Sequence, residues 1–284
     1  MVFRPLRPHE TLLLMAIQRY IVAVPARLAS SRLPNKVLFE IAGKPMIQRV
    51  LEQSSKAAEP NAVVLCTDSI RLQRSAEAWG FPVLMTSDAC ASGSERIASV
   101  AHQLVARAWG EHADDWNPAI RSERLTSTVV INVQCDQPFL DPNIISAIVR
   151  EFALRDPAPA VVTPVYRLDS NIIHNSAVVK TLLAHDGRAL YFSRSAIPHV
   201  RDVDPSEWHK HTDYWGHVGI YGFRGDVLAS WNQLPFSLLE NLERLEQLRM
   251  IEAGLTIATF RVEGTPLSVD TAHQLEQARR MAGA

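Results

Sequence analysis

Cysteine is scarce in this sequence, and long apolar runs are missing from it. Cys66, Cys90 and Cys135 lie far apart without metal-ligand spacing, and their odd number argues against a disulfide framework. No stretch approaches the roughly 20 apolar residues of a membrane-spanning helix. We therefore expect a protein of the reducing cytoplasm that has no membrane partner.

A strong net charge is missing as well. The sequence has 29 Lys and Arg residues against 30 Asp and Glu residues, a formal charge of -1, and no run of like charges forms a tail. This balance gives no general attraction to nucleic acid, so we expect no nucleic-acid partner. Any site for a polyanion must therefore be local.

Two familiar nucleotide-binding motifs are also absent. The sequence contains neither the GxxxxGK[ST] loop nor the GxGxxG fingerprint, whose glycines and following helix hold phosphates in many nucleotide-binding proteins. A P-loop hydrolase and a dinucleotide-dependent dehydrogenase are both disfavoured.

The sequence does contain short apolar strands that alternate with amphipathic helical segments. This alternation is typical of an α/β fold with a mostly parallel sheet. The predicted strands are 20–26, 62–68, 81–87, 128–134, 160–168 and 256–262. The predicted helices are 43–57, 69–80, 94–109, 143–155, 237–254 and a last helix after Asp270.

The domain organisation follows from the same patterns. Residues 1–18 are predicted to be a loosely ordered extension, because the run LLLMAI is too short for a secretory signal and no cleavage site follows it. Residues 19–284 are predicted to form one domain. Within it, the weakly periodic stretch 110–127 is expected to be a surface insertion. The stretch from about 185 to 235, rich in aromatic and turn residues, is expected to be a small excursion from the sheet.

Three cations follow the first predicted strand. Arg27, Arg32 and Lys36 lie in the loop after YIVAVPA, and ligands of α/β proteins bind at the carboxyl ends of such strands. Arginine and lysine side chains together suit a chain of phosphates. The alternative is that these cations are simply solvated. Their position favours an anion site.

Two aspartates are candidate ligands of a hard cation. Asp136 ends the strand TVVINVQ, and Asp270 lies at the start of the last predicted helix. Magnesium is usually held by one or two carboxylates together with substrate phosphates. Asp270 or Thr271 can instead cap the helix, and the two roles of Asp270 are compatible.

Other candidates carry a weaker signal from spacing alone. Gly93 and Ser94 lie at a predicted helix start, where backbone N–H groups can receive an anion or a base edge. Arg194, His217 and Tyr221 lie in aromatic-rich segments. A histidine in an apolar run is more often a packed residue than a catalyst, so that alternative stays open for His217.

Several segments, in order along the chain, resemble one enzyme family. The segments are IVAVPARLASSRLPNKVLFEIAGKPMIQRV, SGSERIA, INVQCDQP, ALYFSRSAIP, HVGIYGF, LERLEQLRMIEAG and VDTAHQLEQAR. Together, from about residue 20 to 280, they resemble the 3-deoxy-manno-octulosonate (Kdo) cytidylyltransferases, also called CMP-Kdo synthetases. The resemblance implies a Rossmann-like fold of the nucleotidyltransferase type, usually homodimeric, with the excursion at 185–235 in sugar binding and dimerisation.

The resemblance also implies a reaction and a set of site residues. CTP and Kdo would give CMP-Kdo and pyrophosphate for lipopolysaccharide biosynthesis, with Mg²⁺ as cofactor. The implied catalytic residues are Arg27, Lys36, Asp136 and Asp270, the last two also on the metal. The implied CTP-binding residues are Arg27, Arg32, Lys36, Ser94 and Arg96. The implied sugar-binding residues are Gln134, Arg194, His217, Tyr221, Glu246 and Gln247.

The chain departs from the family pattern at Asn35, Val37, Cys135, Gln137 and Ala177. Cys135 and Gln137 replace the Gly and Glu that flank the family aspartate, which removes a carboxylate from the expected metal's surroundings. Two alternatives therefore stay open: a cytidylyltransferase for a related sugar acid, such as 8-amino-Kdo or a nonulosonate, and a binding homologue that has lost turnover. The loop SSRLPNK favours the Kdo type over the nonulosonate type.

Overall fold

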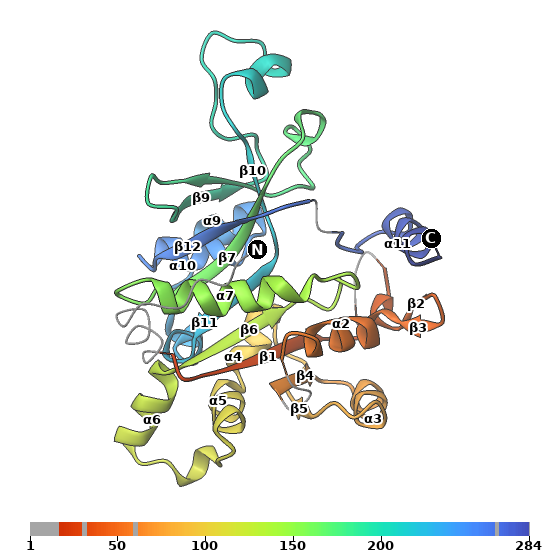
Figure 1. The fold of residues 1–284 in the computed structure, drawn as a ribbon, viewed down its shortest axis with the longest axis vertical. Coiled ribbons are helices and arrows are strands. Elements are labelled where there is room, and N and C mark those ends of the chain that lie inside the picture. The colour runs from red at the N-terminus through yellow and green to blue at the C-terminus, as the bar shows by residue number, and fades with distance from the viewer. Residues whose placement is uncertain (1–16, 30–32, 59–61, 265–266, 284) are drawn as a thin grey trace, which may run out of the picture.

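A ten-stranded mixed sheet organises the molecule. The computed structural model describes residues 17–29, 33–58, 62–264 and 267–283, and Figure 1 shows their arrangement. The strands of this sheet are β1 (Arg19–Ala26), β4 (Val63–Thr67), β5 (Val83–Met85), β6 (Thr128–Val133), β7 (Val161–Arg167), β8 (Lys180–Leu183), β9 (Ala189–Ser193), β10 (Trp215–His217), β11 (Ile220–Arg224) and β12 (Ile257–Val262). A separate ribbon pairs β2 (Glu40–Ile41) with β3 (Lys44–Pro45).

The strand directions agree with the predicted fold class. The order is β5-β4-β1-β6-β11-β7-β10-β8-β9, with β12 on β7. β5, β4, β1, β6, β7, β12 and β8 point the same way, whereas β11, β10 and β9 run against them. The predicted α/β fold with a mixed, mostly parallel sheet is confirmed.

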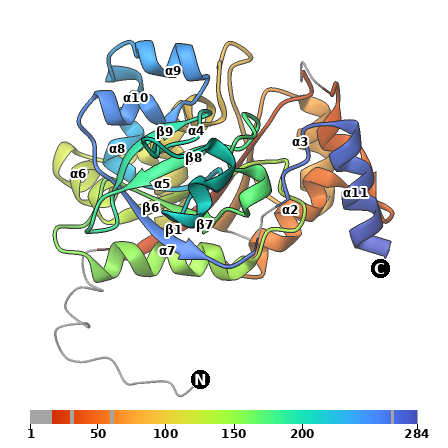
Figure 2. The same ribbon diagram turned by 90° about the horizontal axis from the view of Figure 1, so that it is seen from above.

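Helices cover both faces of this sheet (Figure 2). Their bounds are α2 (Met46–Ser55), α3 (Ile70–Ala78), α4 (Gly93–Ala98), α5 (Ala101–Trp109), α6 (Pro118–Thr126), α7 (Pro142–Leu154), α8 (Gly225–Ala229), α9 (Leu238–Glu243), α10 (Gln247–Glu252) and α11 (Ala272–Gly283). α2, α3 and α7 pack in one apolar core, and α4, α5, α8 and α10 pack in another. Both faces of the central strands are therefore buried.

The central strand β1 is an example of an apolar run in the sequence that forms a strand buried on both faces. Residues 21–26 are all buried, and β4 and β6 flank β1 in parallel. A strand that is covered on both faces reads as a continuous apolar run instead of an alternating one. Because β1, β4 and β6 are parallel, they end at the same edge of the sheet, and the loops that follow them lie close together there.

The predicted excursion corresponds to the antiparallel part of the sheet. β8 and β9 form a hairpin through Gly187, whose φ is +80°. β10 and β11 lie along the same edge of β7, and β10 also pairs with β8, whereas β11 pairs with β6. Figure 1 shows that the segment between β9 and β10 extends away from the rest of the sheet.

Two predicted single helices are each divided in two. The helix expected at 94–109 breaks at Val100, which is buried and has non-helical backbone angles. The helix expected at 237–254 breaks at Arg244, whose φ of 55° and ψ of 48° are left-handed. In both cases the apolar spacing continues across the break, so the pattern alone could not show it.

The stretch 110–127, expected to be a surface insertion, is mostly exposed and folds into a helix. It contains α6, which Asn117 caps by accepting from the Ile120 N–H at 2.9 Å. Trp116 is buried, and the Arg124 guanidinium stacks 3.9 Å from the centroid of Trp109. The helix cap, the buried Trp116 and the stacking of Arg124 on Trp109 stabilise this segment, although its apolar periodicity is weak.

The start of the described chain lies within the predicted extension. Residues 1–16 fall outside the described residues, but Ile17 is buried and the Gln18 N–H donates to the Ser127 carbonyl at 2.8 Å. Ile17 and Gln18 therefore pack against the domain, although the prediction assigned them to the extension. No helix in the described part of the chain has the length and apolar character needed to cross a bilayer.

Candidate active site

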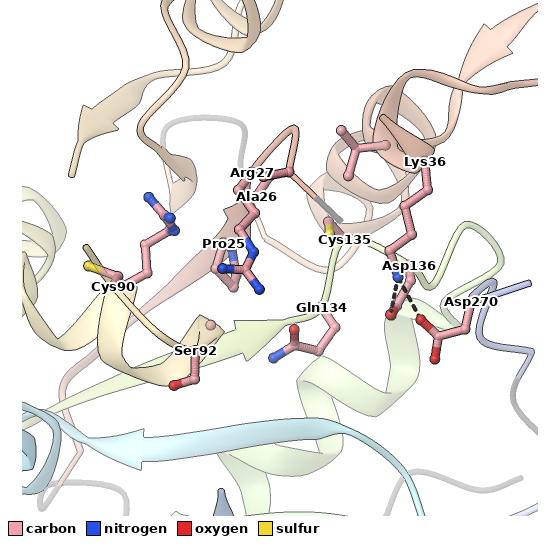
Figure 3. A pocket seen from close by; sticks show the side chains of 14 residues that line it. Pro25, Ala26, Arg27, Lys36, Cys90, Ser92, Gln134, Cys135, Asp136 and Asp270 are labelled. Atoms are coloured by element: carbon pink, nitrogen blue, oxygen red, sulfur yellow. Dashed lines mark hydrogen bonds and ion pairs between the residues drawn. The ribbon is translucent and has the colours of Figure 1, made fainter. Parts of the chain in front are cut away.

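The candidate site is a cavity of about 230 Å³ at the carboxyl ends of β1 and β6. Its lining includes Arg27, Lys36, Ser92, Arg96, Gln134, Asp136 and Asp270. Figure 3 shows these segments around one space, although they come from distant parts of the chain. The position is the one expected for ligands of parallel α/β sheets.

A charged cluster of Lys36, Asp136 and Asp270 forms one end of this cavity (Figure 3). The Lys36 ammonium donates to Asp136 Oδ2 at 3.0 Å and to Asp270 Oδ1 at 2.8 Å. Burial opposes the charge on Lys36, but the two carboxylates outweigh it, so the pKa of this lysine is raised. The cluster brings together three residues that the sequence placed in the catalytic set.

The backbone holds the two aspartates of the charged cluster together. The Val269 N–H donates to the Asp136 carbonyl at 2.9 Å, which ties the segment before α11 to the loop after β6. Thr271 Oγ1 accepts from the Gln274 N–H, and Gln274 Oε1 accepts from the Thr271 N–H, so these two residues form the helix cap. The Asp270 carboxylate is thereby left to bond Lys36 instead of capping α11.

The charged cluster suits a hard divalent cation. Its two carboxylates converge on one cationic atom, and oxygen donors are what Mg²⁺ prefers. Among the described residues, no group of three or more His, Cys, Asp or Glu side chains could hold a metal by itself. A cation here would therefore need further oxygen ligands from a substrate, as magnesium does in phosphate-transfer sites.

The predicted phosphate-binding loop is described only in part. Arg27 lines the cavity and is exposed to solvent, as a cation that meets an incoming anion should be. Arg32 lies outside the described residues, so its expected role stays a prediction. Asn35 adopts a φ of 58°, a conformation that asparagine tolerates better than most residues. The turn therefore forms without the family's glycine.

Arg96 has a different environment from the other cations. It is 2% exposed, and its guanidinium forms an ion pair with Asp68 at 2.8 Å. It also donates to the Thr86 hydroxyl and, at 3.2 Å, to the Ser87 carbonyl. Its charge is therefore already balanced, and it holds the loops after β4 and β5 against α4.

A polar network extends from the cavity towards the antiparallel part of the sheet. Gln134 Nε2 donates to Asn132 Oδ1 at 3.3 Å, and Asn132 Nδ2 donates to the Ser94 hydroxyl at 3.2 Å. The Ser94 hydroxyl in turn donates to Glu246 Oε1 at 2.8 Å. Burial raises the pKa of Glu246, although hydrogen bonds from Ser94 and Ser92 partly oppose this shift.

Close packing at Gly93 brings α4 against this network. A Cβ atom at Gly93 would lie 3.1 Å from Gln134 Nε2 and 3.1 Å from Pro25 Cγ. A larger residue would therefore push α4 away from β1 and β6. Ser94 follows directly, so this contact sets the distance at which its hydroxyl meets Asn132.

Tyr221 and His217 continue the polar network. Tyr221 pairs with Asn132 in the β11–β6 register, and burial, with Glu246 nearby, raises its pKa well above the usual range. The ring centroids of Tyr221 and His217 are 5.3 Å apart. Burial lowers the pKa of His217 to about 3, so this histidine is neutral near pH 7.

The hydrogen bonds of Thr163 decide which nitrogen of His217 carries the proton. Thr163 Oγ1 lies 2.8 Å from the Ile220 carbonyl and 3.2 Å from the Val218 carbonyl, and because both carbonyls can only accept, one of them takes its single hydroxyl hydrogen. The Thr163 oxygen must therefore accept from His217 Nε2, which lies 3.0 Å away. The other ring nitrogen, Nδ1, is left as a hydrogen-bond acceptor.

Gln247 and Arg194, two of the predicted sugar-binding residues, differ in their hydrogen-bond partners. Gln247 begins α10, is 2% exposed, and its Nε2 has no hydrogen-bond partner among the described residues. Arg194 Nε donates to the Glu243 carbonyl at 2.8 Å, and its terminal nitrogens contact the carbonyls of Ser176 and Arg244 at 3.2 and 3.5 Å. In the described structure these carbonyls, and not the network, hold the Arg194 side chain.

Three supporting residues were not identified from the sequence. Asp68 pairs with Arg96, Asn132 joins Gln134 to Ser94, and Thr163 orients His217. A signal existed for two of them, because Asp68 is the acid that ends AVVLCTD and Asn132 is the polar residue inside TVVINV. Thr163 gives no such signal in a strand where threonine is common.

Comparison with known proteins identifies the family. Residues 21–257 match a family model described as cytidylyltransferase. The 3-deoxy-manno-octulosonate cytidylyltransferase of Chlorobaculum tepidum is 36% identical over 264 residues, covering 92% of this chain and 96% of that protein. The chain belongs to the 3-deoxy-manno-octulosonate cytidylyltransferase family. Another member, from Escherichia coli, is 34% identical and covers 93% of this chain and 96% of its own length.

Solved structures agree with membership of the 3-deoxy-manno-octulosonate cytidylyltransferase family. A CMP:2-keto-3-deoxy-manno-octonic acid synthetase in complex with CTP superposes with a TM-score of 0.79 and 34% identity, over 94% of this chain and 99% of that one. A glucose-1-phosphate thymidylyltransferase from Bacillus anthracis has a TM-score of 0.59 at 12% identity, over 93% of this chain and 95% of that one. The second likeness extends to the fold alone.

Proposed function

We propose that this protein transfers the cytidylyl group of CTP to Kdo, giving CMP-Kdo and pyrophosphate for lipopolysaccharide biosynthesis. The observation that carries the proposal is the continuity of the site. The charged cluster, Arg27 and Gln134 line one cavity, and Gln134 begins the polar network. A triphosphate and a polyhydroxylated acid can therefore lie side by side. A related structure of 34% identity holds CTP, which supports the nucleotide.

The nucleotide side uses the cations of the first loop. Arg27, Arg32 and Lys36 would bind the phosphates of CTP, because charge-assisted bonds to phosphate oxygens are strong and directional. The Lys36 ammonium bonds both carboxylates of the charged cluster and also donates to the Val269 carbonyl at 3.4 Å, so it must exchange at least one of these three contacts for a phosphate oxygen. Ser94 and Arg96 would lie near the base and ribose, with Arg96 acting through the loops that it holds.

Asp136 and Asp270 would hold Mg²⁺ when the triphosphate is bound. A bound magnesium ion would offset the charge of the phosphates and make the attacking hydroxyl more acidic. The two carboxylates also release Lys36 towards the phosphates once another cation balances their charge. Loss of either carboxylate should therefore affect both the metal and the lysine.

The sugar side offers hydrogen-bond acceptors, the N–H and O–H donors of amides and a phenol, and one guanidinium. Glu246, the Nδ1 atom of His217 and the amides of Gln134 and Gln247 suit the hydroxyl groups of a sugar acid. Tyr221 adds a phenol between them. Among the described residues, the terminal nitrogens of Arg194 contact two backbone carbonyls, at 3.2 and 3.5 Å. They are the atoms that would bind the carboxylate of Kdo.

The reaction needs positioning more than covalent chemistry. The anomeric hydroxyl oxygen of Kdo forms a bond to the α-phosphorus of CTP, the bond from that phosphorus to the bridging oxygen breaks, and pyrophosphate leaves with the electron pair. The hydroxyl proton passes to solvent. Charge neutralisation and in-line placement account for most of the rate in such transfers. No residue need form a covalent intermediate.

The test is pyrophosphate release with defined substrates. Kdo, 8-amino-Kdo and N-acetylneuraminate are offered separately with CTP and Mg²⁺, and each of the other nucleoside triphosphates then replaces CTP. We expect release only with CTP and fastest with Kdo. Faster release with another acid would change the substrate. A folded protein that releases none would indicate a binding homologue instead of an enzyme.

We also propose that the enzyme acts as a cytoplasmic homodimer. Phe236, Leu238 and Leu242 are 78, 58 and 70% exposed on and beside α9, and large exposed apolar side chains are typical of interfaces. The three cysteines are free thiols, in keeping with a reducing compartment. Sedimentation equilibrium should give twice the mass of one chain, and a monomer at micromolar concentration would contradict the dimer.

A further inference from the structure

The break between α9 and α10 decides where two of the proposed sugar ligands lie. Arg244 interrupts the helical run with left-handed backbone angles, and Glu246 and Gln247 follow immediately at the start of α10. A non-glycine residue in this conformation is strained and persists only where the surroundings hold it. Something must therefore fix the chain at this break.

The side chain of Glu243 fixes it. Its Oε1 accepts from the Ser193 hydroxyl at 2.6 Å, and its Oε2 accepts from the Arg194 N–H at 2.9 Å. Glu243 is the last residue of α9, whereas Ser193 and Arg194 lie at the end of β9, 50 and 49 residues away. Both carboxylate oxygens are used within the protein.

A second hydrogen bond between the end of β9 and the end of α9 has Arg194 as donor from its side chain and the Glu243 backbone as acceptor. Arg194 Nε donates to the backbone carbonyl of Glu243 at 2.8 Å. The Lys180 ammonium donates to the carbonyls of Arg194 and, at 2.7 Å, Val178, so the end of β9 is itself anchored. The result is a clamp, made of Glu243, Ser193 and Arg194, between a rigid strand end and the helix break.

We propose that Glu243 is a positioning residue for the sugar acid. It sets the helix break so that Glu246 meets Ser94 and Gln247 keeps its unpartnered amide in place, and it fixes the backbone from which Arg194 extends. Glu243 does not act on the substrate, because its two oxygens are already bonded to Ser193 and Arg194. This inference rests on the proposed function, of which it specifies the sugar side.

The fold provides a matched control in Glu252, which anchors the other end of α9. Its Oε2 accepts from the Ser237 hydroxyl and, at 3.1 Å, from the Leu239 N–H. Glu243→Ala and Glu252→Ala each remove a carboxylate that accepts from one serine hydroxyl and one backbone N–H and that fixes one end of α9, the first by bonding the end of β9 and the second, from the end of α10, by bonding the start of α9. Only Glu243 lies at the end of α9 that leads to Glu246 and Gln247.

The experiment measures KM for Kdo, KM for CTP and kcat in Glu243→Ala, Glu243→Gln and Glu252→Ala. We expect Glu243→Ala to raise the KM for Kdo roughly tenfold or more, since small misplacements of binding groups are costly, with the KM for CTP within about twofold of the parent value. Glu243→Gln keeps one acceptor and should give a smaller increase in the same parameter. Glu252→Ala should change neither KM. Equal effects of the two alanine variants on the KM for Kdo would overturn the inference.

Amide hydrogen exchange of the free protein separates this inference from the proposed function. Glu243→Ala should speed exchange at 193–195 and 244–248, and Glu252→Ala should not. If the parent protein shows no turnover with Kdo, the proposed function fails, and the clamp is then judged by exchange alone. Unchanged exchange in Glu243→Ala would overturn it whatever the activity. Faster exchange with an unchanged KM for Kdo would overturn its role in positioning.

Discussion

The two ends of the candidate site are built by different means. The charged cluster lies where parallel strands end, and its ion pairs join residues 100 and 234 positions apart in the sequence. The polar network lies where the antiparallel strands and the α9–α10 break meet, and it is held by neutral hydrogen bonds and one buried carboxylate. Ion pairs therefore organise the phosphate end, and hydrogen bonds between buried polar groups organise the sugar end. Variants at the phosphate end should therefore change kcat and CTP binding, and variants at the sugar end should change the KM for Kdo.

The largest effect is expected at the charged cluster. Asp136→Ala removes a proposed metal ligand and a partner of Lys36, so kcat should fall on the order of 1,000-fold, while the melting temperature changes little because the carboxylate is near the surface of the cavity. Steady-state pyrophosphate release and thermal unfolding measure the two quantities. Near-normal turnover in a folded variant would remove Asp136 from the metal site.

A smaller effect, on the KM for Kdo instead of on kcat, is expected from a variant in the polar network. Glu246→Gln keeps an acceptor for the Ser94 hydroxyl but loses the charge and one acceptor, which should raise the KM for Kdo roughly tenfold. The KM for CTP should stay within about twofold. Initial rates with each substrate varied in turn provide the measurement. An equal rise in both KM values would erase the distinction between the two ends.

The burial of His217 should make the free energy of unfolding depend on pH. Burial lowers its pKa to about 3 in the folded protein, whereas the unfolded chain binds the proton below about 6.5. The unfolded state therefore binds more protons between these values, and the free energy of unfolding should fall as the pH falls through this range. Urea unfolding at pH 7, 6 and 5 should show a slope up to about 1.4 kcal/mol per pH unit shallower in His217→Asn. Identical slopes would show that His217 is not buried in its neutral form.

The smallest effect is expected at Cys135, which stands where the family has glycine. Burial, with Asp136 beside it, raises the pKa of this thiol to about 12, so it is neutral and a poor metal ligand. Cys135→Gly should change kcat by less than about threefold. The same pyrophosphate assay measures it, and a large change in either direction would show that the thiol takes part in the site.

The sequence predicts the phosphate end better than the sugar end. Apolar runs bounded by turn residues define β1, β4 and β6, and the side chains that follow such strands meet at one edge of the sheet. Asp136 and Lys36 could therefore be assigned from position alone. Asp270 is a candidate from its position as well, but its local pattern favours a helix cap, so the resemblance is needed to support its place at the metal.

The sugar end depends on contacts that no local pattern reveals. The break at Arg244 requires Glu243 to reach β9, 50 residues earlier in the sequence, and the apolar spacing of 237–254 continues as if the helix were whole. The environment of Arg96 likewise depends on Asp68 from a neighbouring strand. Such features come from tertiary structure that overrides helix propensity.

Binding of CTP without sugar acid tests the division between the two ends most directly. Calorimetric titration with CTP and Mg²⁺ is compared for the parent protein, Lys36→Met and Glu246→Gln. We predict a dissociation constant at least tenfold weaker in Lys36→Met, since a charge-assisted phosphate contact is lost, and unchanged within about twofold in Glu246→Gln. Weakened binding in Glu246→Gln with none in Lys36→Met would contradict the account.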